Sequence, residues 1–224
     1  MKNIPSGADL AQYSVNRSGQ TEVVRQSLYD YLTYAQAGQS QLSFFANPIG
    51  QGTTSHPGST GPKTRADTNM TLPGQLPAPI KYLVRSIEID MLPGTEPSLG
   101  YAANAPSSFV NDLYNVGRSG YLIFTIGSKD YLIEAPLHKF PPKTRFHTSS
   151  SQSDASTAAA SQFSQTASGF WDGRAYVLDA PLYLESTQNF SVTLNWPNAV
   201  ALAAADTTAR IGVILDGLLY RLSQ

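Results

Sequence analysis

The stretch Phe190-Ser-Val-Thr-Leu-Asn-Trp196 decides the fold class of this 224-residue chain. Apolar and polar residues alternate along it without exception. Period-two alternation is typical of a β-strand that has one face on a core and the other in water. The stretch therefore predicts a half-buried strand close to the end of the chain.

A second β-rich run follows at residues 209–222 and is interrupted only by Asp216-Gly217. Asp-Gly between two such runs predicts a turn or a bulge, because glycine accepts a positive φ at little steric cost. Together the two runs predict an all-β domain whose final strands complete its sheets.

Further strands are predicted along the chain. In residues 81–92 the apolar set Ile87, Ile89 and Met91 alternates with Ser86, Glu88 and Asp90, and we expect this polar face to meet water. Gly127-Ser-Lys129 joins two β-rich runs and predicts a hairpin. The remaining predicted strands are 41–46, 120–126, 130–135, 174–179 and 182–185.

Two short helices are predicted. Residues 21–37 carry an apolar stripe of Val24, Leu28, Tyr31 or Leu32, and Ala35, at spacings of three and four. Thr21 is a suitable N-cap and Gly38 a suitable stop. Such a helix packs either on its own domain or on a neighbouring subunit, and the pattern leaves both open. The second helix is predicted at 107–116.

Long connections separate these elements. Residues 47–79 are rich in proline and glycine and predict an extended loop. Residues 148–168 are rich in Ser, Ala, Gln and Thr and predict a flexible insertion or a weak helix. We divide the chain into an N-terminal arm with an amphipathic helix, residues 1–40, and a β domain, residues 41–224.

Many short strands with long connections favour an antiparallel jelly-roll sandwich, a single barrel preceded by the arm and its short helix. An immunoglobulin-like sandwich fits less well, because the strand spacing is irregular and several connections are too long.

The composition is poor in charge. Only 14% of the residues are charged, the net charge is −1, and there is no cysteine. No apolar run approaches the roughly 20 residues of a transmembrane helix. The first residues lack the apolar stretch of a secretory signal, so we expect a protein that acts in the cytoplasm or leaves it by another route.

Catalytic and metal-binding patterns are absent from the sequence. His56, His138 and His147 do not have metal-ligand spacing. Glu88 and Asp90 are the one carboxylate pair on a strand face, and a solvated face gives the same pattern. We expect no catalytic residues, no cofactor and no metal. The first 25 residues contain only Lys2, Arg17 and Arg25 as basic residues, too few for a genome-binding arm.

Three features of the sequence together suggest a family. They are the arm with its predicted helix at 21–37, the extended segment 67–79 that leads into the strand 81–92, and the strand-rich ending 181–222. In this order of features the chain resembles the jelly-roll capsid proteins of small or tailless icosahedral bacteriophages.

The resemblance implies a major capsid protein that self-assembles into an icosahedral shell in the host cytoplasm and resides in the virion. It implies contacts between copies, as trimers or pseudo-hexameric capsomers, and with other virion proteins. Contact with an internal membrane is left open. The predicted subunit-interface residues are Val24, Leu28, Tyr31, Leu32, Phe44 and Phe45.

Other functions remain open at this point. The chain fits a minor capsid, decoration or tail-associated jelly roll. It also fits a non-catalytic carbohydrate-binding module that uses exposed tyrosines and Trp171. A glycosidase or cupin-like enzyme is the alternative that needs Glu88 and Asp90 in a concave pocket.

Overall fold

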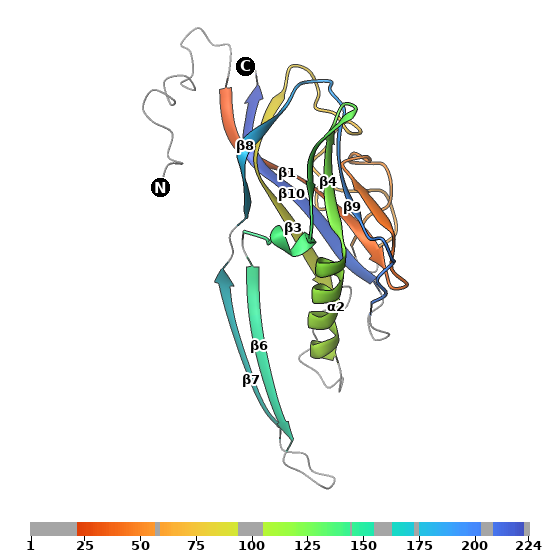
Figure 1. Ribbon diagram of the computed structural model, residues 1–224, viewed down its shortest axis with the longest axis vertical. Helices are drawn as coiled ribbons and strands as arrows, with labels where there is room; N and C mark the ends of the chain where they lie inside the picture. Colours follow the sequence, from red (N-terminus) through yellow and green to blue (C-terminus); the bar gives the residue numbers. More distant parts are fainter. Residues whose placement is uncertain are drawn as a thin grey trace, which may run out of the picture.

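The computed structural model describes residues 22–56, 59–93, 105–143, 145–154, 163–172, 175–202 and 208–221. Two four-stranded antiparallel sheets face each other and form the body (Figure 1). One sheet has the order β1-β10-β3-β8 and the other β2-β9-β4-β5. The strands of the body are β1 (Glu22–Ala35), β2 (Gln41–Phe44), β3 (Lys81–Pro93), β4 (Tyr121–Ile126), β5 (Lys129–Glu134), β8 (Tyr176–Leu184), β9 (Phe190–Asn195) and β10 (Thr208–Arg221).

Strand pairing in the body is nested. In chain order the first strand pairs with the last, and the same holds moving inward: β1 with β10, β2 with β9, β3 with β8, and β4 with β5. The body therefore has the pairing of one long hairpin. This hairpin is rolled over so that β10 also meets β3 and β9 also meets β4.

Several predicted elements are confirmed. The strand predicted from the alternation at 190–196 is β9, whose inward residues Phe190, Val192 and Leu194 are all buried. The hairpin is β4–β5, and Gly127 in its turn has a positive φ of 62°. The predicted helix at 107–116 lies within α2 (Ala105–Ser119).

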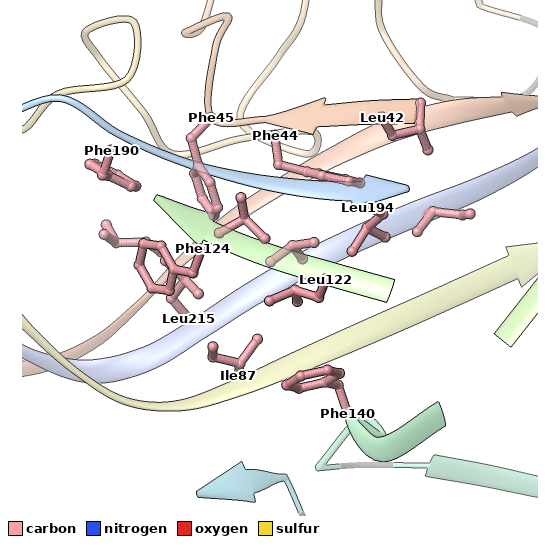
Figure 2. Close-up of a cluster of buried hydrophobic side chains, with 14 of the residues drawn as sticks. Leu42, Phe44, Phe45, Ile87, Leu122, Phe124, Phe140, Phe190, Leu194 and Leu215 are labelled. Atoms are coloured by element: carbon pink, nitrogen blue, oxygen red, sulfur yellow. The ribbon is translucent and has the colours of Figure 1, made fainter. Parts of the chain in front are cut away.

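The core lies between the two sheets. Phe44, Phe124 and Phe190 from one sheet point toward Ile87 and Leu215 of the other (Figure 2). Trp196 closes one end of the core, where its Nε1 donates a hydrogen bond to the Val116 carbonyl oxygen at 3.0 Å. The apolar alternation read from the sequence is thus what fills the space between the sheets.

The helix predicted at 21–37 is wrong. These residues form β1, which pairs with β10 along all fourteen of its positions. The inward face of β1 carries Leu28, Asp30 and Tyr34, all of them buried. The polar Asp30 interrupts the apolar alternation of this face, so the remaining apolar residues imitate a helical spacing. The strand belongs to the body, and residues 1–21 of the predicted arm lie outside the described residues.

Asp216-Gly217 is a bulge position and not a turn, because β10 continues through it. The pairing with β3 shifts there, and Arg85 is the extra residue on β3. Gly217 is required at this position, since a Cβ would collide with the Leu83 carbonyl oxygen. The predicted strands 174–179 and 182–185 likewise merge into one strand, β8.

The flexible insertion or weak helix predicted at 148–168 is also wrong for the residues that the structure describes. β6 (Arg145–Asp154) and β7 (Phe163–Asp172) pair over ten positions and form a two-stranded ribbon. The ribbon extends away from the two sheets (Figure 1). Because it is not folded onto the core, its sequence lacks the apolar alternation that would have predicted strands.

The connection between β2 and β3 is a long loop, as predicted for 47–79. Apart from isolated bridges, its described residues form neither helix nor strand. It nevertheless packs along β1: the Tyr31 N–H donates to the Asp67 carbonyl oxygen at 2.8 Å, and the Asn69 N–H donates to the Tyr29 carbonyl oxygen at 3.4 Å. The loop thereby covers one edge of the first sheet.

Candidate functional site

Three of the six predicted subunit-interface residues lie in the core of their own chain. Leu28, Phe44 and Phe45 are all buried within the hydrophobic cluster between the sheets. Phe44 belongs to β2 and Phe45 follows it, and Figure 2 shows both rings pointing inward. Their apolar character is therefore explained by intramolecular packing.

The other three predicted residues do not form a common surface. Val24, Tyr31 and Leu32 are half-buried on β1. Leu32 packs against the core, whereas Tyr31 lies on the outer face of the sheet. Adjacent residues of a strand point to opposite faces, so the predicted helical stripe is not present.

The polar face of β3 is only partly solvated, contrary to the prediction. Glu88 is 6% exposed, and its Oε2 accepts a hydrogen bond from the Lys143 N–H at 2.7 Å. Asp90 Oδ2 accepts from the Tyr31 hydroxyl at 3.4 Å. Burial raises the pKa of both carboxyls above the ordinary values, although these hydrogen bonds act in the opposite direction.

The side chain of Tyr31 reaches from β1 across β10 to β3 on this outer face. Its cross-strand partner on β10 is Gly212, whose partner on β3 is Asp90. The ring lies over Gly212, where a Cβ would collide with it, and the Arg210 guanidinium lies 4.1 Å from the ring centroid. Burial, reinforced by the charge of Asp90, raises the pKa of Tyr31 to about 12.

Asp216 is the second polar centre of the same face. It accepts hydrogen bonds from the side chains of Lys143 at 2.6 Å, Arg25 at 3.0 Å and Ser27 at 3.2 Å. Burial acts to raise the pKa of Asp216, but its hydrogen bonds to Lys143 and Arg25 outweigh burial and lower it. Lys143 therefore contacts both Glu88 and Asp216, and it lies two residues before the ribbon begins.

Two open hollows lie along this face. The larger, of about 610 Å³, is lined by Gln26, Ser27, Tyr29, Tyr31, Arg65, Ala66, Asn69 and Ile214. The smaller, of about 330 Å³, is lined by Arg25, Gln26, Ser27, Glu88, Lys143, Ile214 and Asp216. Glu88 and Asp216 both line the smaller hollow, and their pKa values are shifted in opposite directions. Both carboxylates already accept hydrogen bonds from Lys143, Glu88 from its backbone N–H and Asp216 from its Nζ.

The long loop is fastened by a buried carboxylate. Asp67 is fully buried and accepts hydrogen bonds from Thr54, Ser55 and Thr64 at 2.6–3.1 Å. The Arg210 guanidinium lies 3.7 Å from the same carboxylate. Burial acts to raise the pKa of Asp67, but the hydrogen bonds from Ser55, Thr64 and Thr54 outweigh it and hold the pKa well below the ordinary value.

A buried ion pair also connects the loop to β1. Lys63 Nζ lies 2.5 Å from Asp30 Oδ1, and the two side chains are 1% and 0% exposed. The other oxygen of Asp30 accepts a hydrogen bond from the Phe45 N–H at 2.7 Å. Phe45 has a positive φ of 68°, an unusual conformation for a residue other than glycine, and Asp30 helps to hold it.

Large exposed apolar residues lie on an edge strand of each sheet. Tyr131 and Ile133 on β5 are 53% and 62% exposed, and Val177 and Tyr183 on β8 are 47% and 42% exposed. Tyr131 is an extra, bulged residue of β5, and Pro181 within β8 has no N–H to donate, so both edges are poorly suited to adding another strand. Their side chains, rather than their backbones, are available for contacts.

Metal-ligand clusters and membrane-spanning helices are both absent from the described residues. That part of the chain contains no cluster of histidine or acidic side chains that could hold a metal ion. His56 and His138 are exposed, and the side chain of His147 lies outside the described residues. No helix of the described chain has the length and apolar character that crossing a membrane requires.

Sequence reasoning missed the residues that organise the polar contacts, namely Lys63, Asp67, Lys143, Arg210 and Asp216. Each bonds to a residue distant in the chain; Lys63 and Asp30, for example, are 33 positions apart. A lone lysine in a loop rich in proline and glycine gives no local signal that it is buried.

Comparison with known proteins gives no relative. No family model matches the chain, no curated protein matches its sequence, and no solved structure matches its fold.

Proposed function

We propose that this chain is a structural virion protein, the major capsid protein of an icosahedral bacteriophage shell, built on a single jelly roll. The nested strand pairing carries the proposal. A jelly roll has eight strands in two facing sheets joined as two Greek keys. The two facing sheets, with β1 paired to β10 and β4 paired to β5, support this topology for the chain.

The long connections support assembly into a shell. The ribbon β6–β7 extends from the body, and an isolated two-stranded ribbon is at best marginally stable in water. In the proposed assembly a second copy of the chain packs against the ribbon. In the proposed shell the ribbon is therefore a contact between subunits.

The surface supports the same proposal. Exposed apolar side chains lie on β5 and β8, at an edge of each sheet. Large apolar side chains at the edges of the sheets favour contacts with a partner, and the centres of protein interfaces are depleted in charge. The low charged fraction of 14% agrees with many such contacts per subunit. The partners are copies of the chain, as trimers or pseudo-hexameric capsomers, together with other virion proteins.

The experiment that tests this function measures the native mass of the purified protein by light scattering, followed by negative-stain images. We expect capsomers or closed shells. A variant carrying Tyr131→Glu and Ile133→Glu on β5 should remain folded and lose assembly. Tyr114→Glu on α2, where Tyr114 is 61% exposed, is the matched control and should leave assembly intact. A protein that stays monomeric at all concentrations contradicts the proposal.

One observation favours a second candidate, a carbohydrate-binding module. Tyr29 and Tyr31 meet edge to face with ring centroids 6.3 Å apart, and both line the larger hollow beside the amide of Asn69. Aromatic faces with neighbouring amides are suited to sugar rings. A monomer that binds glycans and loses binding on Tyr29→Ala would support this candidate instead of the shell.

A further inference from the structure

The ion pair between Lys63 and Asp30 differs from every other ion pair of the described residues. Both of its side chains are dry, at 1% and 0% exposure. Lys143–Asp216 has a nearly equal separation of 2.6 Å, but its lysine is 45% exposed. The two pairs therefore share a geometry and differ in their contact with water.

The surroundings of Lys63 suit an ammonium group poorly. An ammonium has three N–H donors, whereas the described residues offer Lys63 Nζ one acceptor, Asp30 Oδ1. Asp30 faces inward from β1 beside Phe45, which is fully buried. An isolated buried ion pair rarely recovers the cost of removing both charges from water, and here the cation is also short of acceptors.

We propose that Lys63 and Asp30 condense into an amide, an intramolecular isopeptide bond that joins the long loop to β1. The inference does not depend on the function of the chain. It assigns a covalent modification to two residues that would otherwise be a buried ion pair in the core.

The reaction is a balanced condensation. Within the dry pair the ammonium proton passes to the carboxylate, which leaves a neutral amine and a carboxylic acid. Lys63 Nζ then attacks Asp30 Cγ, so the N–Cγ bond forms. The Cγ–Oδ1 bond breaks, and Oδ1 leaves as one water molecule that carries the carboxyl proton and one proton from Nζ. No oxidant or co-reactant is needed.

Three properties of the site favour this step. Burial raises the pKa of Asp30 and so favours its neutral acid form, although the charge of Lys63 acts in the opposite direction. The Phe45 N–H already points at Oδ2, where negative charge develops during the attack, so it acts as a fixed donor. Exclusion of water opposes hydrolysis of the product, which carries no charge and has one N–H in place of three.

Mass spectrometry of the denatured, purified protein tests the proposal. We expect a mass 18 Da below that of the sequence. Trypsin cleaves after Arg25, Lys63 and Arg65, and an acylated Lys63 is not cleaved. The digest should therefore contain residues 26–65 as one peptide that is 18 Da light. A protein with the full sequence mass overturns the proposal.

Substitutions locate the bond. Lys63→Arg retains the charge but cannot form the amide, so its mass should equal that of its sequence. Lys143→Arg makes the same substitution in the exposed pair, which has a nearly equal separation, and should keep the 18 Da loss. If Lys63→Arg still shows the loss, the water has left from another site, such as an Asp-Gly succinimide, and the assignment is wrong. These masses are read on unfolded chains, so they do not require the variants to fold.

Discussion

The two longest connections of the molecule are opposites in structure and in attachment. The loop between β2 and β3 has no regular strands, yet Asp67 and the Lys63–Asp30 pair fasten it to the body. The ribbon β6–β7 is regular along ten paired positions, yet it extends away from the sheets. Regular secondary structure therefore does not measure how firmly a segment belongs to a fold; buried polar contacts and packing do.

The largest loss of stability is expected from Asp67→Ala, which removes the carboxylate that fastens the long loop. The change leaves buried donors of Thr54, Ser55 and Thr64, and the nearby Arg210 charge, without their acceptor. We expect a loss of about 3–5 kcal/mol in the free energy of unfolding, measured by urea denaturation. Asp130→Ala is the control, because Asp130 is exposed and accepts one hydrogen bond from Thr125; it should cost less than about 0.5 kcal/mol.

The pH dependence of the same variant sharpens the test. Because the pKa of Asp67 is lowered in the folded protein, the unfolded chain binds a proton first as the pH falls. The stability from Asp67 is therefore complete above the unfolded pKa of about 3.9 and declines below it. Asp67→Ala should lack this part of the acid destabilisation. Parallel acid curves for the two proteins would contradict the role given to this carboxylate.

A smaller effect is expected from Gly212→Ala, which alters the position below the Tyr31 ring on the outer face of the sheet. The new Cβ collides with the Tyr31 ring, and overpacking of this kind costs about 1–3 kcal/mol. Gly117→Ala on α2 is the control, since its Cβ meets His138 at an ordinary 3.7 Å. In the double variant with Tyr31→Ala the collision is gone, so the measured losses should not be additive.

Glu88→Gln tests the contact just before the ribbon, where the Lys143 N–H donates a hydrogen bond to Glu88. The amide oxygen still accepts the Lys143 N–H, while the buried charge is removed. We expect the variant to be as stable as the wild type at pH 7, or more stable by up to about 1 kcal/mol.

The pH dependence of this stability difference follows from the raised pKa of Glu88. The folded protein retains the proton at a pH where the unfolded chain has lost it, so the contribution of Glu88 declines as the pH rises from about 4.3 through the folded pKa. The advantage of Glu88→Gln should therefore disappear in acid. Glu185→Gln, which removes an exposed carboxylate, is the control. A variant much less stable at pH 7 would show that the charge itself is needed.

The smallest effect on stability is expected from removing the ribbon. Arg145 and Asp172 are cross-strand partners, so a short Gly-Ser linker can replace residues 145–172. We expect the free energy of unfolding to change by less than about 0.5 kcal/mol. Circular dichroism and the urea midpoint are the measurements. Unfolding of the shortened chain would show that the ribbon belongs to the core.

Prediction from sequence succeeded where a strand has one apolar face. The run that became β9 alternates strictly and buries its apolar residues between the sheets. The β4–β5 hairpin was predicted from its turn residues, and every second residue of β4 is buried. Prediction failed for β1, because Asp30 occupies an inward position and its partner Lys63 is 33 residues away. It failed for the ribbon for the opposite reason, since a ribbon outside the core has no apolar face to reveal it.

The candidate site was less predictable than the fold. The acidic face of β3 was identified from the sequence, but the burial of Glu88 depends on Lys143, which arrives from a later segment. Leu28 and Phe44 were assigned to subunit contacts because they are apolar, and the core of their own chain accounts for them. Local patterns identify apolar residues; only the tertiary structure determines which surface they cover.

The nested strand pairing also bears on the order of events during synthesis. β10, the last strand in chain order, lies between β1 and β3 and is the neighbour that joins them. While the ribosome is still making residues 208–221, those two strands have no shared partner. Contacts between such distant parts of a chain form slowly. Folding of the two-sheet body therefore waits until residues 208–221 have been translated, and a nascent chain stalled before residue 208 is a natural client for chaperones.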